Sequence, residues 1–376
     1  MEPRLGSRAD WQIALAITAA LRVFYSAVAA LAAAIVHPRD GLIRSNALTQ
    51  TLPPTGNWHY AFIGVWERFD TLWYLHIAQR GYDLPGAVVF YPLYPGLIRA
   101  LSWVVEPAAA ALLISTIAAF FYFYGLLRLA RGDGAESSAV RLVLLAAVWP
   151  ASFFFFAGYT EPLATALIVW CIAWARDERW LAAALCALAA GLTRSAGTLL
   201  MVPLVVLAWR ARGRENKNSR WWIWLAPLGT LGYWLWLRQT GRLSIRAAYR
   251  AYWSTEVGPP WTTLSLTLQS LVHRFQPLVV ISLIALAFFL VAGVLARRRI
   301  EDRWFSMAVI AHMMLRICSP PLFGAPRYLL PVYPAYLTMG RWAERMSRAR
   351  LALLCLALFA CNLVWMWEFL SWSLVL

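Results

Sequence analysis

Charge is what this chain of 376 residues has least of. Charged residues make up 14% of it and hydrophobic residues 61%, against about 25% and about 45–50% in soluble domains. A chain of this composition cannot cover itself with a polar surface, which excludes a soluble globular protein. Apolar runs near the roughly 20-residue spanning length recur from end to end, and 22 Trp and 15 Tyr suit rings that anchor at both membrane interfaces.

Other features are missing as well. The five cysteines show no CxxC or CxxH spacing, so neither a zinc site nor a disulfide framework is indicated. No glycine-rich phosphate loop occurs, which argues against a nucleotide-sugar substrate. The first apolar segment is too long for a signal peptide and lacks a small-residue cleavage site, so we interpret it as a retained helix.

The apolar runs predict an all-α polytopic membrane protein, with residues 1–376 as a single integral membrane domain. About eleven transmembrane helices are expected by the ~20-residue criterion. They are placed at 11–36, 108–128, 139–157, 159–176, 179–193, 196–210, 220–238, 277–296, 303–318, 328–342 and 350–372.

The scarcity of acidic residues leaves a net charge of +16. On a soluble protein this would suggest nucleic acid, but here the basic residues cluster in short loops, which is typical of membrane topology. With the N-terminus in the cytoplasm, nearly every dense arginine cluster falls on the cytoplasmic side. No nucleic-acid partner is therefore expected. The arginine- and alanine-rich composition suggests a prokaryotic plasma membrane.

This topology leaves residues 37–107 as one long external loop. Within it, segment 66–79 has helical periodicity, with Trp66, Phe69 and Trp73 on one stripe and Asp70 beside it. Segment 95–105 is a second short apolar stretch. Both are predicted to be amphipathic helices that lie in the interface rather than span the membrane.

Charged residues at the outer ends of the predicted spans form the candidate site. A charge inside a span costs several kcal/mol unless it is paired or hydrated, yet Glu161, Arg194 and Arg327 all fall at outer junctions. They project to the same face as Glu67 and Asp70. Each alone could be an interfacial side chain that snorkels to water; this alternative is as good as a functional role for Arg194 and weaker for Glu161, which has a short side chain.

The external loop after residue 238 breaks the topology rule, because Arg238, Arg242, Arg246 and Arg250 repeat every four residues. On a helix they would form a basic stripe. Guanidinium groups match phosphate bidentately, so a lipid phosphate is one natural partner. Binding of ordinary anionic lipid, or a topology error at this point, explains the stripe equally well.

The sequence from Trp66 to Pro95 resembles the signature of the PIG-V-like mannosyltransferases, relatives of GPI mannosyltransferase 2 within the GT-C membrane glycosyltransferases. The matching elements are Phe69-Asp70, an aromatic-Leu-x-Ile-Ala stretch from Tyr74, Gly81-Tyr82 and the segment FYPLYP. Later segments PASFFFFAGYTEPL, LTRSAG and PRYLLPVYP are also similar in order and placement. Phe69 departs from the family pattern, which commonly has Trp there.

The resemblance implies a GT-C-type bundle and an inverting transfer on the outer face of the membrane. The donor would be a polyprenyl-phosphate-linked sugar, with mannose indicated by the family likeness alone, and the acceptor a glycolipid or glycan. Asp70 would be the catalytic base. Together with the loop residues above, the predicted substrate-binding residues are Glu67, Trp73, Tyr74, Tyr94, Tyr159, Glu161, Arg194, Arg246, Arg250, Arg327 and Tyr328.

No cofactor is predicted, because no cluster of metal-binding side chains is evident in the sequence. Glu67, Asp70 and Glu161 could together supply such a cluster, so a divalent metal stays open. Two other functions stay open as well. A secondary transporter or lipid flippase would place polar groups near the midplane, commonly in two related halves. A structural subunit of a larger membrane complex would need no catalytic acid.

Overall fold

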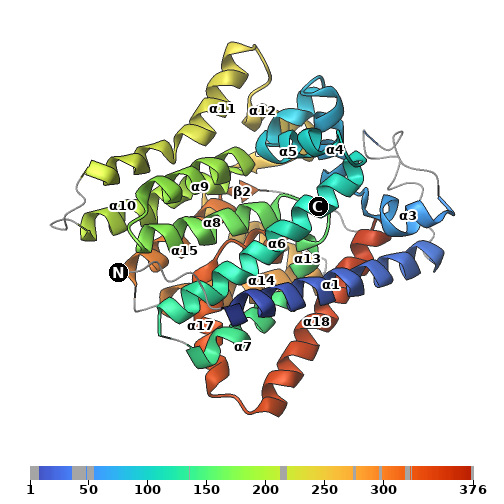
Figure 1. Cartoon of the computed structure of the whole chain (residues 1–376). Coiled ribbons are helices and arrows are strands. Elements are labelled where there is room, and N and C mark those ends of the chain that lie inside the picture. The colour runs from blue at the N-terminus through green and yellow to red at the C-terminus, as the bar shows by residue number, and fades with distance from the viewer. Residues whose placement is uncertain are drawn as a thin grey trace. The chain divides into compact units, whose positions relative to one another are not determined.

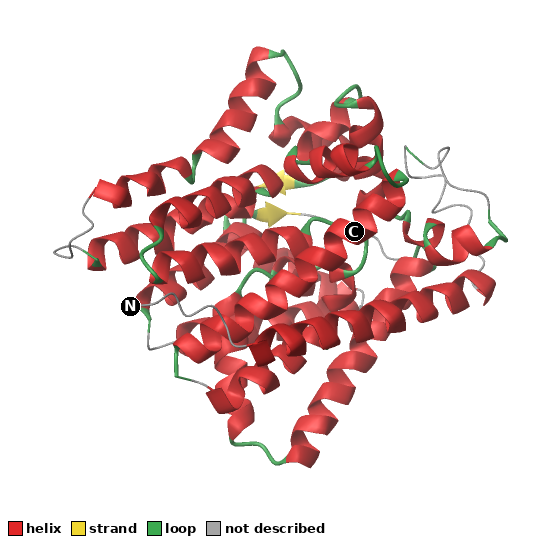
Figure 2. Ribbon diagram, viewed as in Figure 1, coloured by secondary structure: helices red, strands yellow, loops and turns green. Residues whose placement is uncertain are grey.

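The computed structural model describes residues 8–35, 48, 55–134, 136–211, 218–273, 277–295, 299–317, 322 and 324–373. In these ranges the chain is almost wholly helical, with one pair of two-residue strands (Figure 2). The predicted all-α class is thereby confirmed. Residues 37–47 and 49–54 of the predicted external loop lie outside the described residues, as do 212–217 and 318–321.

The elements are labelled in Figure 1. In chain order they are α1 (Arg8–Ile35), α3 (Trp58–Phe62), η2 (Gly64–Trp66), α4 (Asp70–Arg80), η3 (Pro85–Val89), α5 (Leu93–Leu101), α6 (Pro107–Gly132), α7 (Glu136–Ala147), η4 (Ser152–Phe155), α8 (Glu161–Arg176), α9 (Trp180–Thr193), η5 (Ser195–Leu200), α10 (Met201–Arg210), η6 (Asn218–Leu225), α11 (Leu228–Gln239), α12 (Ile245–Trp253), β1 (Glu256–Val257), α13 (Pro260–His273), α14 (Pro277–Leu295), α15 (Ile300–Met314), β2 (Arg316–Ile317), α16 (Ala325–Tyr328), α17 (Tyr333–Glu344) and α18 (Arg348–Leu370).

The chain forms two compact units, each built from separate stretches of sequence. Unit 1 comprises Met1–Gly81, Leu93–Ala166 and Gly340–Leu376, and unit 2 comprises Tyr82–Pro92 and Leu167–Met339. Most of the predicted external loop therefore belongs to unit 1, whereas its short 82–92 stretch belongs to unit 2. The expected single integral membrane domain stays a prediction.

Three described helices are long and apolar enough to cross a membrane. They are Ala9–Ile35, Pro107–Gly132 and Arg348–Leu370, all in unit 1. Four shorter apolar helices accompany them, at Ser137–Ala147, Trp180–Thr193, Ser195–Arg210 and Val279–Leu295. Length and composition thus identify an integral membrane protein.

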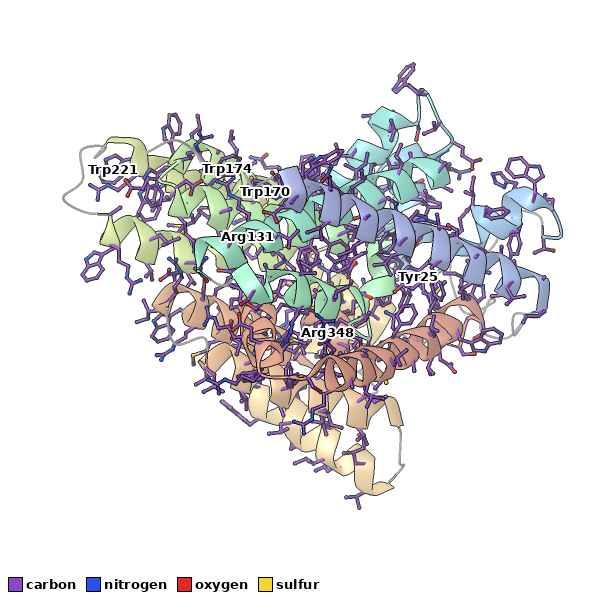
Figure 3. All side chains as sticks on the ribbon, turned by 60° about the horizontal axis from the view of Figure 1, so that its bottom comes forward. Tyr25, Arg131, Trp170, Trp174, Trp221 and Arg348 are labelled. Carbon is purple, nitrogen blue, oxygen red and sulfur yellow. The ribbon has the colours of Figure 1, made fainter. Side chains whose placement is uncertain are left out.

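In unit 1, helix α1 packs against both α6 and α18. Tyr25 of α1, labelled in Figure 3, donates its hydroxyl to Asn362 Oδ1 of α18 at 3.0 Å. The same asparagine donates to Trp149 O at 2.9 Å and to Ser152 Oγ at 3.0 Å. These buried polar groups satisfy one another, so they fix the packing of α1, α18 and the segment after α7.

Polar contacts show which helix ends lie together in unit 1. Arg131, also labelled in Figure 3, closes α6 and lies 2.6 Å from Asp10 at the start of α1. Asp133 lies 3.6 Å from Arg341 of α17. The start of α1 and the loops near 133 and 341 therefore share one end, as the topology predicts. The opposite end of α6, about 39 Å away at 1.5 Å per residue, lies next to Glu106 of the predicted external loop.

In unit 2, the contacts made at the two ends of α15 show which other helix ends lie together. At its first turn, Asp302 accepts two hydrogen bonds from Arg176, at 2.8 and 2.7 Å, and a third from the Tyr333 hydroxyl. Its neighbour Glu301 accepts one from Arg210 at 2.8 Å. The ends of α8 and α10 therefore meet the start of α15. The candidate arginines described below lie beyond its other end, next to β2.

Close approach of helices in unit 2 depends on glycine. A Cβ added to Gly229 of α11 would lie 2.3 Å from Leu188 O, and one added to Gly197 of η5 would lie 2.2 Å from Ala190 C. Any side chain at these positions would force α9 apart from its neighbours. The α9–η5–α11 packing is therefore set by backbone contact.

Several predicted boundaries are wrong. The span predicted at 139–157 ends as α7 at Ala147, because Pro150 disfavours helical geometry in the residue before it, and η4 follows. The span predicted at 303–318 ends at Met314, where the chain turns into β2. The 66–79 helix begins only at Asp70, and α13 was not predicted at all.

Candidate active site

Asp70 is the first residue of α4 and follows a tight turn. The N–H of Thr71 donates to Arg68 O at 3.0 Å, which closes the turn. Its first central residue, Phe69, has φ +48° and ψ −117°, close to the type II′ geometry that normally calls for glycine. Such a conformation costs a non-glycine residue about 1–3 kcal/mol, and strain of this kind clusters at functional sites. The strained turn fixes the direction in which Asp70 enters the helix.

The 158–161 segment packs directly on the start of α4. A Cβ added to Gly158 would lie 2.7 Å from Thr71 Cγ2, so the two backbones approach closely. One turn further along, the hydroxyl oxygens of Tyr74 and Thr160 are 3.1 Å apart. Because Tyr74 follows Asp70 by four residues, both lie on one face of α4. This face is the one that meets the 158–161 segment.

Tyr94 of α5 adds a third element to this arrangement. Its ring lies edge-on to that of Tyr74, with centroids 5.1 Å apart. Its hydroxyl donates to Ala111 O at 2.9 Å and lies 2.8 Å from Ser115 Oγ. Ser115 in turn donates to Tyr159 O at 3.2 Å. A buried polar chain therefore connects α5, α6 and the 158–161 segment.

Unit 1 thus brings together most of the predicted residues that belong to it. Glu161 is the first residue of α8 and is only 3% exposed, and Trp73 of α4 is also buried. A carboxylate at the N-terminus of a helix is favoured by the helix dipole. The predicted residues gathered around the start of α4 in this unit are Asp70, Trp73, Tyr74, Tyr94, Tyr159 and Glu161.

Glu67 lies just before the turn, in a partly buried cluster of ionisable groups. Burial, followed by the nearby Glu106 carboxylate, raises the pKa of Glu67 from 4.5 to about 7, although His59 and Arg68 oppose the shift. His59 Nε2 lies 2.7 Å from both carboxylate oxygens of Glu106. Glu67 can therefore hold or release a proton near neutral pH, which the sequence alone did not predict.

Arg22 connects the start of the Trp66–Pro95 stretch to the PASFFFFAGYTEPL segment (150–163), although the sequence suggested no functional role for it. Its guanidinium donates to Phe156 O at 2.7 Å and lies over the Trp66 ring, 5.3 Å from the centroid. It also bonds Ser26 Oγ at 3.1 Å. A single arginine within a long apolar run was the only sequence signal for this contact.

In unit 2, three guanidinium groups surround one aromatic ring. The Cζ atoms of Arg316, Arg327 and Arg194 lie 4.6, 5.5 and 5.7 Å from the centroid of Tyr328. Arg316 also lies 4.9 Å from the ring of Tyr249. Such cation–π contacts hold arginines in place through a neutral partner. Arg194, Arg327 and Tyr328 were predicted from the sequence, whereas Arg316 was missed because it lies near a predicted span end.

The predicted basic stripe is not one continuous helix. Helix α11 ends at Gln239 and α12 starts at Ile245, with Gly241 between them at φ +63°. Arg246 and Arg250 therefore share α12, whereas Arg238 belongs to α11. The correction has a local cause, since glycine takes a left-handed conformation easily and ends helices.

Helix α12 nevertheless lies at the same end of unit 2 as the three arginines, because its Tyr249 contacts Arg316. Arg250 lies 3.0 Å from Glu256 of β1, and both side chains are more than half exposed. Arg246 is exposed as well. The predicted anion-binding residues of unit 2 thus lie away from the ends of α8 and α10 that meet the start of α15.

The predicted residues are accordingly distributed over both units. Proximity of Arg194 and Arg327 to Asp70 and Glu161 stays a prediction. Within the described parts of the chain, no three His, Cys, Asp or Glu side chains are placed to hold a metal ion.

Comparisons with known proteins bear on the fold. No family model and no curated protein matches the chain. Among solved structures, it is similar to ArnT from Cupriavidus metallidurans bound to undecaprenyl phosphate, with a TM-score of 0.52 and 13% identity over 91% of this chain. The chain spans 64% of the length of that protein.

Two further structures are similar at lower scores. They are the apo state of the same ArnT, with a TM-score of 0.48, 13% identity and coverage of 76% of this chain and 56% of that chain, and the Archaeoglobus fulgidus oligosaccharyltransferase in complex with Zn and sulfate. For the latter the TM-score is 0.41, the identity 13%, and the coverage 93% of this chain and 53% of that chain.

The chain has a GT-C-type fold. The likeness to ArnT with bound undecaprenyl phosphate extends over nine-tenths of the chain, and the described residues are helical as that fold requires. The predicted fold class is confirmed at this level.

Proposed function

We propose that this protein is an inverting glycosyltransferase that moves a sugar from a polyprenyl-phosphate donor to a lipid-linked or glycan acceptor. The observation that carries the proposal is the strained turn that delivers Asp70 to the start of α4, in a chain whose fold is shared with a structure that binds undecaprenyl phosphate. The resemblance to PIG-V-like enzymes favours mannose as the sugar and transfer on the outer face of the membrane, and the arginine- and alanine-rich composition favours a prokaryotic plasma membrane.

A single carboxylate is enough for such a reaction. A glycosidase needs a second carboxylic acid because an alkoxide leaves poorly. A lipid phosphate leaves without being protonated, so the enzyme needs one general base to accept the proton of the acceptor hydroxyl as that oxygen attacks the anomeric carbon. The glycosidic bond forms as the bond from that carbon to the phosphate oxygen breaks. Asp70 is assigned the role of the base.

The arginines around Tyr328 are assigned to the phosphate group. Charge develops on the phosphate as its bond to the sugar breaks, and fixed guanidinium groups stabilise that charge. Arg194, Arg316 and Arg327 are held against one ring, so they need little reorganisation when the anion binds. Arg246 and Arg250 on α12 would add weaker, solvent-screened attraction for the donor.

The proposal is tested with purified protein, a set of polyprenyl-phosphate sugars and a lipid-extract acceptor pool, followed by mass analysis of the products. The Asp70→Asn variant should retain donor binding and lose turnover by about 10²–10⁴-fold, the usual contribution of general base catalysis. Glu344→Gln, which removes an exposed carboxylate near the other end of the same unit, is the matched control and should stay active. Turnover of Asp70→Asn within a few-fold of the wild type would refute the assignment. Movement of the lipid across vesicle membranes without a new glycosidic bond would instead favour a secondary transporter or lipid flippase.

A further inference from the structure

The end of α18 packs against the residues that immediately precede Asp70. The ring of Phe69 lies 5.7 Å from that of Phe369 and 5.0 Å from that of Trp372, centroid to centroid. The Arg68 guanidinium lies 5.0 Å from the Trp372 ring. Trp372 is 1% exposed. Two residues of the strained turn are therefore covered by a segment from the far end of the sequence.

Phe369 also contacts the PASFFFFAGYTEPL segment (150–163). Its ring centroid lies 5.5 Å from that of Phe153, 5.9 Å from that of Phe154 and 5.8 Å from that of Tyr159. It lies 6.4 Å from the ring of Trp66 as well. One side chain of α18 thus joins the segment before Asp70 to the segment that packs on the start of α4.

We infer that Phe369 and Trp372 are positioning residues that hold the Phe69 turn in the conformation that presents Asp70. Phe69 keeps a positive φ without being glycine, and such a conformation persists only when the surroundings over-determine it. The rings of Phe369 in α18 and of Trp372 just after it hold the Phe69 side chain, so the backbone cannot relax to an ordinary φ without breaking both contacts. Relaxation of this turn would redirect the first residue of α4.

The rest of α18 provides an internal control. Trp367 lies in α18, five residues before Trp372, but is 44% exposed, and within the described part of the chain its ring does not contact the 66–69 segment. Truncating Trp367 therefore removes a tryptophan from the same helix without touching the turn. A general effect of α18 on folding should appear in both variants, whereas an effect on the turn should appear only at Trp372.

The catalytic part of the inference rests on the proposed function, and the contact with the turn does not. In the transfer assay, Trp372→Ala should lower kcat about tenfold with little change in the donor KM, because only the placement of the base is disturbed. Trp372→Phe, which retains a ring, should recover most of the loss, and Trp367→Ala should match the wild type. Wild-type kcat in Trp372→Ala, or equal losses in both alanine variants, would overturn the inference.

A second measurement does not need activity. Amide hydrogen exchange of residues 66–72 in detergent should be faster by about tenfold in Trp372→Ala and unchanged in Trp367→Ala, since exchange reports local opening. Unchanged exchange in Trp372→Ala would overturn the inference that this ring holds the Phe69 turn, even if the enzyme is active. If exchange is faster in Trp372→Ala but the wild-type protein transfers no sugar, the positioning role stands and the proposed function alone is refuted.

Suppression gives the sharpest test. Glycine takes a positive φ at no steric cost. In Phe69→Gly, the turn should therefore form without support from the rings of Phe369 and Trp372. Adding Phe69→Gly to Trp372→Ala should therefore raise kcat above that of Trp372→Ala alone. If the kcat loss of the double variant relative to the wild type equals the product of the two single-variant losses, the effects are independent, which would count against the inference.

Discussion

A single methyl group at Gly158 should disturb the candidate site without altering any of its chemical groups. A Cβ at this position would lie 2.7 Å from Thr71 Cγ2 and 3.2 Å from Thr71 Oγ1, whereas carbon atoms in contact normally lie about 3.5–4.0 Å apart. About 1 Å of movement is needed to relieve the overlap. Thr71 follows Asp70 directly, so the start of α4 has to give way.

The size of the effect follows from that displacement. Overpacking a close-packed contact costs about 1–3 kcal/mol, and a misplacement of about 1 Å can cost about 10²-fold in rate. Gly158→Ala should therefore lower kcat by about 10- to 100-fold and lower the unfolding midpoint measured in detergent. Gly96→Ala in α5 is the matched control, because a Cβ there meets nothing within 4 Å and alanine in a helix is favoured by about 0.5–1 kcal/mol.

A compensating change makes the prediction specific. Thr71→Ser removes Cγ2, the atom in closest contact, and keeps the hydroxyl group. The Gly158→Ala, Thr71→Ser double variant should therefore recover much of the activity that Gly158→Ala loses, with a coupling energy of about 0.5–3 kcal/mol. Activity and stability of Gly158→Ala equal to those of the wild type would refute the close packing of the 158–161 segment on α4. Failure of Thr71→Ser to compensate would refute the role of this one contact.

Three further predictions concern charge. The pKa of Glu67 is raised from 4.5 to about 7, which means that the folded state binds this proton more tightly than the unfolded state. The stability of the wild type relative to Glu67→Gln should therefore be greatest below pH 4.5 and fall as the pH rises through 7. Thermal unfolding of both proteins across this pH range measures the difference. Tyr328→Leu should raise the donor KM several-fold while Tyr328→Phe stays near the wild type, because the ring and not the hydroxyl attracts the arginines; equal KM values in both variants would contradict this. Asp302→Asn leaves Arg176 buried without its charge partner and should destabilise the protein by about 3–5 kcal/mol, whereas Arg250→Gln, which breaks an exposed pair, should change stability by at most about 1 kcal/mol.

Much of the architecture follows from local sequence. Hydropathy is a property of short windows, so the runs that became α1, α6 and α18 could be placed to within a few residues. The distribution of arginine among the loops predicted which helix ends lie together, and the Asp10–Arg131 pair of unit 1 agrees with that arrangement. The aromatic segment around Asp70 was also evident, because carboxylates among tryptophans and tyrosines are unusual in an apolar chain.

Local breaks in the helices were harder to predict. Gly241 interrupts the arginine repeat, and Pro150 ends α7 early. Both residue types are recognised signals for such breaks, but the four-residue spacing of the arginines and the continuous hydropathy outweighed them. The prediction failed where one backbone preference competed with a longer periodic pattern.

The fine structure of the candidate site was decided by tertiary contacts alone. Phe69 takes a glycine-like conformation and contacts the rings of Phe369 and Trp372, and no local pattern encodes a contact between segments so distant in sequence. Arg316 joins the arginine cluster because β1 pairs with β2, which hydropathy cannot detect. Burial and the neighbouring Glu106 raise the pKa of Glu67, and burial depends on what the folded chain places around a residue. Composition and periodicity thus determined the fold class and the segment that bears Asp70, whereas long-range packing determined its backbone geometry and its charged surroundings.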